Sequence, residues 1–202
     1  MAKRIRVALL VFDEVDLLDV GGPYEVFLTA NRLAERRGKT APFEVVTVAA
    51  ESGLKTSYGG LDLAAQQSFD VLGDDDVLIV PGAIDIVTVL KDEQLLRMVS
   101  GHAQRGLVAS VCTGAFILAA AGVLDGRPFT THWEDVGDLA ERVRGGEPRA
   151  DVRWVDDGNI VTSGGLSSGI AMALHLVARL VDPDLAQATA DQIDYVWTER
   201  RG

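Results

Sequence analysis

The sequence has a single cysteine and only three histidines among its 202 residues. A lone cysteine excludes a disulfide framework, so we expect a protein of the reducing cytoplasm. No pair of histidines has the spacing of metal ligands, and we expect neither a metal site nor a cofactor. No stretch approaches the roughly 20 consecutive apolar residues of a membrane-spanning helix, so we expect no membrane partner.

Positive charge is also scarce. Lys and Arg total 19 against 30 Asp and Glu, which gives a formal net charge of -11. Binding to nucleic acid needs clustered Lys and Arg, so we expect a small-molecule substrate and no direct contact with nucleic acid. Hydrophobic residues make up 48% of the chain. This is enough to bury a full core, and we expect one domain over residues 1–202.

Apolar runs of strand length alternate with helical segments along the chain. Predicted strands cover residues 5–12, 43–50, 77–80, 106–111, 152–155 and 160–162, and predicted helices cover 23–37, 92–105, 115–121, 133–143, 168–181 and 183–197. Residues 54–68 indicate a small hairpin. This alternation predicts an α/β fold, a doubly wound sandwich with a mostly parallel central sheet. Ligands bind at the carboxyl ends of the strands in such sheets, so the loops that follow these ends are where we expect the site.

Cys112 lies where the apolar run 106–111 meets the predicted helix 115–121. A thiol at a helix N-terminus feels the partial positive charge of unpaired amides, which lowers its pKa and favours the thiolate. The strand-turn-helix also lifts the side chain out of the sheet, as in a nucleophile elbow, and Gly114 suits the crowded turn. The alternative is an inert buried cysteine. The position at the turn favours a reactive nucleophile.

Asp19 belongs to the segment 16–23, which follows the first predicted strand. Leu17, Leu18 and Val20 indicate that this loop is tucked inwards, so that the carboxylate is partly buried. A buried acid either finds hydrogen-bond donors or keeps its proton. An Asx turn that leads into the helix predicted from Pro23 explains Asp19 equally well.

Three further strand ends carry candidate site residues. The turn Pro81-Gly82-Ala83 could offer amide donors to a developing negative charge. The loop 162–169 is rich in Gly and Ser but lacks the Gly-Lys-Ser/Thr ending of a phosphate loop, so we expect it to bring backbone close to Cys112. His132 ends a short predicted strand, where it either reaches the site or acts as a structural cap.

Five motifs occur in one order: Leu18-Asp-Val-Gly-Gly-Pro23, Val80-Pro-Gly82, the Cys112-Thr-Gly114 elbow, Thr130-Thr-His-Trp133 and Thr162-Ser-Gly-Gly165. With these motifs the chain resembles the ThiJ/PfpI superfamily, the Parkinsonism-associated deglycase fold, over nearly its whole length. The resemblance implies a flavodoxin-like sandwich, usually a homodimer with the pocket near the interface. Cys followed by Thr, with an Asp in the first loop, is most similar to isonitrile (isocyanide) hydratase. It is also similar to the amidase-like amino-terminal domains of AraC-type transcription regulators.

By this resemblance Cys112 is the nucleophile, Asp19 its acid/base partner and Thr113 the neighbouring hydroxyl. Peptidases of the superfamily carry His after the nucleophilic Cys, so Thr113 weighs against peptidase activity. Ala83 stands where the family often has a second Gly, and Ala171 stands where hydratases tend to have Asp, which leaves the substrate open. We expect the substrate to contact a set of strand-end residues, namely Gly82, Ala83, Gly165, Leu166 and His132.

Functions of different classes remain open at this point. In a hydratase, Cys112 would attack the terminal isocyanide carbon, Asp19 would deliver a proton to that carbon, and water would release an N-substituted formamide from the thioimidate. A ligand-sensing or regulatory module would keep the pocket for binding only. A deglycase, glyoxalase or redox-sensing thiol is a third possibility, for which Asp19 is less suited than the glutamate of those relatives.

Overall fold

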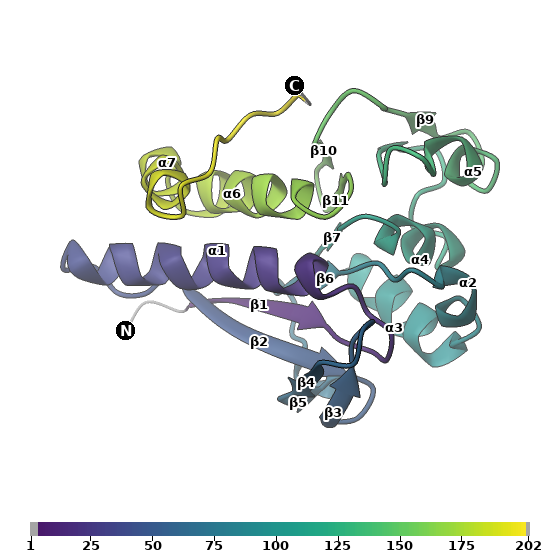
Figure 1. Ribbon diagram of the computed structural model, residues 1–202, viewed down its shortest axis with the longest axis horizontal. Coiled ribbons are helices and arrows are strands. Elements are labelled where there is room, and N and C mark those ends of the chain that lie inside the picture. The colour runs from purple at the N-terminus through teal and green to yellow at the C-terminus, as the bar shows by residue number, and fades with distance from the viewer. Residues whose placement is uncertain (1–3, 201–202) are drawn as a thin grey trace.

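A seven-stranded sheet forms the centre of the computed structural model, which describes residues 4–200 (Figure 1). The strand order is β10-β11-β7-β6-β1-β2-β5, and only β10 runs antiparallel to its neighbour. Its strands are β1 Ile5–Leu10, β2 Phe43–Ala49, β5 Gln67–Ser68, β6 Val77–Val80, β7 Leu107–Ser110, β10 Trp154–Asp157 and β11 Ile160–Ser163. The predicted α/β sandwich with a mostly parallel, flavodoxin-like sheet is confirmed.

Two small two-stranded sheets lie beside the main one. One is the antiparallel hairpin of β3 Gly53–Thr56 and β4 Asp62–Ala65, which confirms the hairpin expected within residues 54–68. The other is a parallel pair of β8 Pro128–Phe129 and β9 Glu147–Pro148. The second pair supports the chain that leads from β8 to His132.

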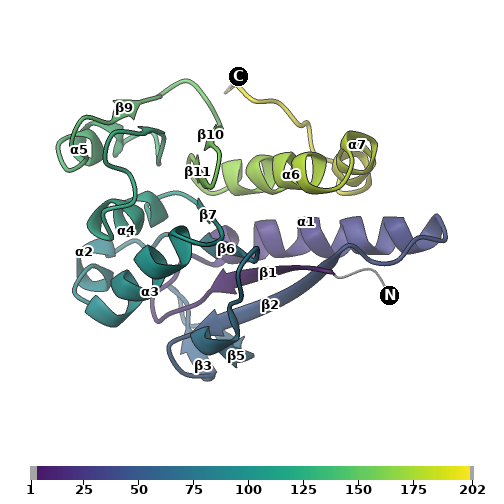
Figure 2. The ribbon, with the colours of Figure 1, turned by 180° about the vertical axis from the view of Figure 1, so that it is seen from behind.

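Helices cover both faces of the sheet (Figures 1 and 2). Three long helices pack on one another over one face: α1 Leu17–Arg36, α6 Ser168–Leu180 and α7 Pro183–Gln192. The other helical elements lie on the opposite side: α2 Ile86–Val89, α3 Glu93–Ala103, α4 Gly114–Ala120, α5 Val136–Ala140 and the 3-10 turn η1 Phe69–Val71. No helix within residues 4–200 combines the length and apolarity that crossing a membrane requires.

Strand β1 shows why the central strands appear as apolar runs in the sequence. Val7 and Leu9 belong to the hydrophobic core under α1 and α6, whereas Ala8 and Leu10 belong to the core under α3 and α4. All four side chains are fully buried. Because successive residues of a strand point to opposite faces, a strand covered on both sides needs apolar residues at every position.

Helix α1 begins six residues before the predicted start at Pro23. Asp16 is its N-cap and accepts a hydrogen bond from the Leu18 amide at 3.3 Å, which satisfies one of the free amides of the first turn. Pro23 lies inside the helix. Asp19 therefore lies in the first helical turn, where the structure confirms the buried carboxyl group and excludes the alternative of an Asx turn that leads into a helix at Pro23.

Two other predicted helices are longer than the observed ones. The helix expected over residues 133–143 is reduced to α5, and the helix expected over 183–197 ends with α7 at Gln192. The indole of Trp197 instead donates a hydrogen bond to the Ala171 carbonyl at 3.1 Å, so tertiary contacts hold this segment outside the helix. Residues 1–3 and 201–202 lie outside the described residues, and a single domain over 1–202 stays a prediction.

Candidate active site

Cys112 occupies a strained turn between β7 and α4. Its φ is +54°, in the left-handed region that residues other than Gly rarely adopt. A Cβ on Gly114 would collide with the Val80 carbonyl oxygen and come within 2.9 Å of the Pro81 backbone, so this position requires glycine. The elbow expected from the sequence is therefore present. It places the thiol at the carboxyl end of β7.

Hydrogen bonds fix the backbone of Cys112 on both sides. Its amide donates to the Gly164 carbonyl at 3.0 Å, and the Thr131 hydroxyl donates to its carbonyl at 2.7 Å. Gly164 follows β11 and Thr131 follows β8, so three strand ends meet at this residue. These bonds stabilise a backbone conformation that is unfavourable in isolation.

Asp19 is completely buried at the start of α1. Its Oδ2 accepts a hydrogen bond from the Gly82 amide at 2.9 Å, whereas its Oδ1 has no hydrogen-bond partner within residues 4–200. Burial raises the pKa of Asp19 to about 7; the Gly82 hydrogen bond opposes this shift and the charge of Asp16 adds to it. Near neutral pH this carboxyl group can therefore both accept and donate a proton.

The thiol of Cys112 does not have the lowered pKa that the helix-end argument predicts. Burial, followed by the charge of Asp19, raises the pKa of Cys112 to about 12, while the amides of Thr113 and Leu166 act in the opposite direction. The side chain is 8% exposed, so the loss of water outweighs the partial charge at the end of the short helix α4. In the resting protein the sulfur carries its proton, and the nearby charge of Asp19 contributes to this preference.

Thr113 fastens the loop that follows β6. Its hydroxyl donates to the Ala83 carbonyl at 2.9 Å and accepts from the Ala83 amide at 3.0 Å. The Gly82 amide is likewise occupied by Asp19. The expectation that Gly82 and Ala83 offer free amide donors is wrong, because both amides already hold site residues in place.

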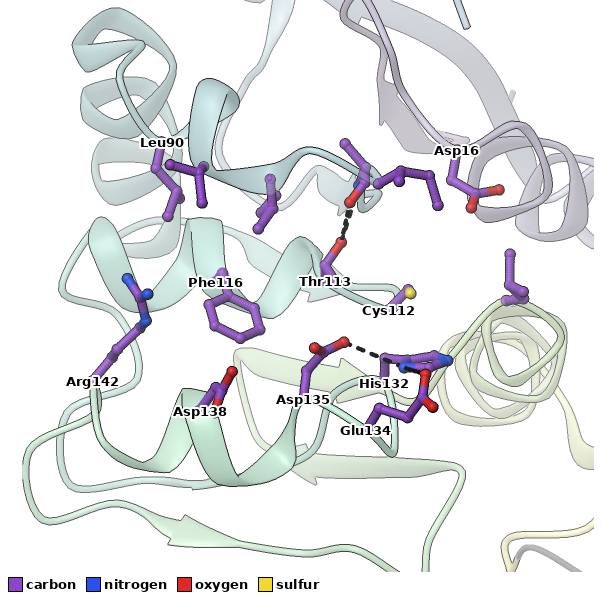
Figure 3. A pocket seen from close by; sticks show the side chains of 15 residues that line it. Asp16, Leu90, Cys112, Thr113, Phe116, His132, Glu134, Asp135, Asp138 and Arg142 are labelled. Atoms are coloured by element: carbon purple, nitrogen blue, oxygen red, sulfur yellow. Dashed lines mark hydrogen bonds and ion pairs between the residues drawn. The ribbon is translucent and has the colours of Figure 1, made fainter. Parts of the chain in front are cut away.

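A cavity of about 340 Å³ opens in front of Cys112 (Figure 3). Of the residues predicted from the sequence, Cys112, Thr113, Ala83, Leu166 and His132 line it. Asp19 and Gly82 are buried behind its floor, and Gly165 lies against a neighbouring cavity. The structure thus separates the predicted residues into those that line the cavity and those that contact the lining residues from outside it.

His132 reaches the cavity from the segment after β8. Its Nδ1 lies 3.3 Å from an Asp135 carboxylate oxygen and 3.9 Å from one of Glu134. A Cβ on Gly165 would collide with the imidazole ring, so glycine there makes room for the histidine. His132 is accordingly a cavity residue held by carboxylates rather than a structural cap.

The remaining cavity residues were not predicted from the sequence. They are the apolar side chains of Ile84, Ile86, Val87, Leu90 and Phe116 and the charged side chains of Asp16, Glu134, Asp135, Asp138 and Arg142. A usable signal exists in the spacing of Asp135, Asp138 and Arg142, which places them on one side of a helix. Within the described residues, no group of three or more His, Cys, Asp or Glu could hold a metal ion.

Fold and elbow together define a class of protein. Residues 5–179 match the DJ-1/PfpI family, and the chain belongs to this family. An isonitrile hydratase of Pseudomonas putida is 37% identical over 192 residues, which cover 95% of this chain and 78% of that protein.

Two further relatives show the range of the family. A THiJ/PfpI family protein from Pseudomonas syringae superposes with a TM-score of 0.83 at 28% identity, covering 96% of this chain and 76% of that one. The HTH-type transcriptional regulator GlxA of Rhizobium meliloti is 30% identical over 189 residues, which cover 92% of this chain. The match spans 56% of the regulator's length.

Proposed function

We propose that the protein is an isonitrile hydratase that uses Cys112 as a covalent nucleophile and converts an isocyanide to an N-substituted formamide. The observation that carries this proposal is the position of Cys112 between a cavity and the buried Asp19, whose Oδ1 has no hydrogen-bond partner among the residues that the structure describes. The 37% identity to an isonitrile hydratase supports the reaction class. No step requires a cofactor.

In the first step, sulfur attacks the terminal carbon of the isocyanide. Ionised Asp19 accepts the thiol proton as the S–C bond forms and then delivers it to the same carbon, which yields a thioimidate. The S–H bond breaks, and one S–C and one C–H bond form. An acid with a pKa of about 7 is suited to this exchange near neutral pH, because it accepts and releases a proton at similar cost.

In the second step, water adds to the thioimidate carbon. One proton of this water passes to the imidate nitrogen and the other passes to sulfur as the S–C bond breaks and the C=O bond forms, so that the N-substituted formamide leaves with the thiol and Asp19 in their initial states. We propose that His132, held by Asp135, positions this water. Attack by sulfur replaces the direct attack of water on the isocyanide with two easier steps.

Thr113 acts in this mechanism as a positioning residue, because its hydroxyl holds the loop at Ala83. We propose that Ala83, Leu166 and His132 contact the substrate, whereas Gly82 holds Asp19 and Gly165 makes room for His132. A cytoplasmic homodimer, as the family resemblance implies, is part of the same proposal.

The decisive experiment is incubation of the protein with a neutral alkyl isocyanide. We expect the formyl proton of the formamide to appear in the NMR spectrum, with loss of the isocyanide stretching band in the infrared spectrum. Rapid mixing followed by mass spectrometry should trap the thioimidate on the Cys112 peptide. Absence of both product and adduct would refute hydratase activity.

A ligand-sensing module is the second candidate, and the match to a transcriptional regulator is the observation that favours it. In that function the cavity binds a ligand without turnover. Binding of an isocyanide or formamide with no change in the ligand would support it. Turnover of methylglyoxal, with isocyanides unchanged, would instead indicate the glyoxalase or deglycase alternative.

A further inference from the structure

The cavity in front of Cys112 has two chemically different walls (Figure 3). The wall formed by α2 and the chain before it is apolar and consists of Ile84, Ile86, Val87 and Leu90. The opposite wall is formed by α5 and its flanking residues. It carries charged side chains, which Figure 3 shows facing Phe116 and Thr113 across the cavity.

The charged wall follows from the spacing along α5. Asp135 is the N-cap of this helix, Asp138 lies in its first turn, and Arg142 lies just beyond its end. Side chains three or four positions apart share one side of a helix, so all three face the cavity. Four carboxylates line the cavity in total, those of Asp16, Glu134, Asp135 and Asp138, against one guanidinium and one imidazole.

These charges differ in whether the protein itself already pairs them. Asp135 and Glu134 lie near His132, and Asp16 accepts from the Leu18 amide. The guanidinium of Arg142 lies over the Phe116 ring, 5.5 Å from its centre. Asp138 has neither a hydrogen bond nor an ion pair to any other residue in the described part of the chain. Asp138 therefore lines the cavity as a carboxyl group with no partner among the described residues.

We propose that the substrate of this site is an isocyanide whose N-substituent carries a cationic group, held at Asp138. This inference rests on the proposed hydratase function. The isocyanide carbon lies at Cys112, the alkyl part of the substituent lies against the α2 wall, and the cation faces the carboxylates of α5. A substituent with a carboxylate is disfavoured, because the carboxylates outnumber the cations around it.

An isosteric pair of substrates tests the charge alone. The cationic probe is 2-(trimethylammonio)ethyl isocyanide, and the neutral probe is 3,3-dimethylbutyl isocyanide, in which carbon replaces nitrogen. We expect kcat/KM to be about tenfold higher for the cation at low salt, given the modest strength of partly exposed ion pairs. Added KCl should reduce this ratio, because salt screens exposed charges. Equal values for the two probes would overturn the proposal.

Asp138→Asn is the matched variant, and Glu141→Gln is its control. Glu141 is the C-cap of the same helix and is exposed, but it does not line the cavity. We expect the cation-to-neutral ratio to fall about threefold in Asp138→Asn and to stay unchanged in Glu141→Gln. A similar fall in both variants would assign the preference to the overall charge and not to Asp138. Thermal midpoints of both variants should show that each is folded.

Arg142 provides the opposite test. With 3-isocyanopropanoate as an anionic probe, we expect kcat/KM below that of the neutral probe and a further decrease in Arg142→Gln. If the anion is instead preferred and this preference disappears in Arg142→Gln, then Arg142 selects the substrate and the proposal is wrong.

Binding measurements separate this inference from the proposed reaction. Calorimetry on Cys112→Ala with the two corresponding formamides reports charge preference without any turnover. If neither isocyanide reacts but the cationic formamide binds about tenfold more tightly, hydratase activity fails and the charge preference stands. If both isocyanides react equally well and both formamides bind equally, the reaction stands and the cationic substrate class is refuted.

Discussion

Two regions of one cavity place carboxylates in opposite environments. Behind the floor, Asp19 is fully buried, burial raises its pKa to about 7, and its Oδ1 has no hydrogen-bond partner in the described part of the chain. On the α5 wall, Asp138 is exposed to solvent. The same type of side chain thus has a raised pKa at position 19, because burial makes its charge costly there, and lies open to water at position 138. Burial, rather than residue type, distinguishes the two carboxyl groups.

The largest expected effect comes from Cys112→Ala, which removes the nucleophile from the floor. Turnover of an isocyanide should fall to near the uncatalysed rate, because no other residue at the elbow can form the thioimidate. The thermal midpoint should change little, since alanine keeps the Cβ that the turn already accommodates. Product formation is followed by NMR. A variant that still hydrates the isocyanide at a comparable rate would exclude covalent catalysis by Cys112.

Asp19→Asn sharpens the comparison between the floor and the exposed acids. The amide keeps the size of the side chain and can still accept from Gly82, but it cannot carry the proton, so turnover should fall by roughly 10²–10⁴-fold. Asp16→Asn, a change of the same kind one turn earlier, should cause a much smaller loss, since Asn also caps helices well. The kcat values of the two variants give the two losses of turnover, and their thermal midpoints show whether each variant is folded. Equal losses would contradict a special role for the buried acid.

The pH dependence of kcat/KM tests the raised pKa of Asp19. This pKa lies above its usual value, so the group is protonated below about pH 7 and ionised above it. The reaction needs the ionised form to accept the thiol proton. We therefore expect kcat/KM to decrease about tenfold per pH unit below this pKa and to reach a plateau above it. In Asp19→Asn the residual kcat/KM should no longer decrease below pH 7. An unchanged decrease would assign the titration to another group.

The smallest expected effect concerns Thr113, whose hydroxyl holds the loop at Ala83. Thr113→Val removes a hydroxyl that makes two hydrogen bonds to Ala83 and leaves both backbone groups of that residue unpaired. We expect the free energy of unfolding in urea to fall by about 1–3 kcal/mol. Thr113→Ser keeps the hydroxyl and should retain most of the stability. A loss of the same size in both variants would show that the methyl group, not the hydroxyl, matters.

Local patterns in the sequence were sufficient to predict much of the fold and the position of Cys112 at a turn between a strand and a helix. The apolar run in β1 predicts a strand buried on both faces, because neighbouring side chains alternate between the two cores. The turn at Cys112 was predictable from the strand before it and the helix after it, whereas the crowding that requires glycine at position 114 comes from the backbone of Val80 and Pro81. Pro23 predicts too late a start for α1, because Asp16 already caps the helix and Pro23 lies inside it.

The sequence by itself thus determined most of the strands and helices, their order along the chain and the position of the thiol at the end of a strand. Only the tertiary structure decided the electrostatics of the site. The pKa of Cys112 depends on burial and on the charge of Asp19, which belongs to a helix far away in the sequence. Together they raise this pKa, whereas the position at a helix end predicts that it is lowered. The Gly82 amide is likewise taken by Asp19, 63 residues away in the sequence. Secondary structure depends largely on neighbours along the chain, whereas proton affinity depends on solvent exclusion and on charges brought together by folding.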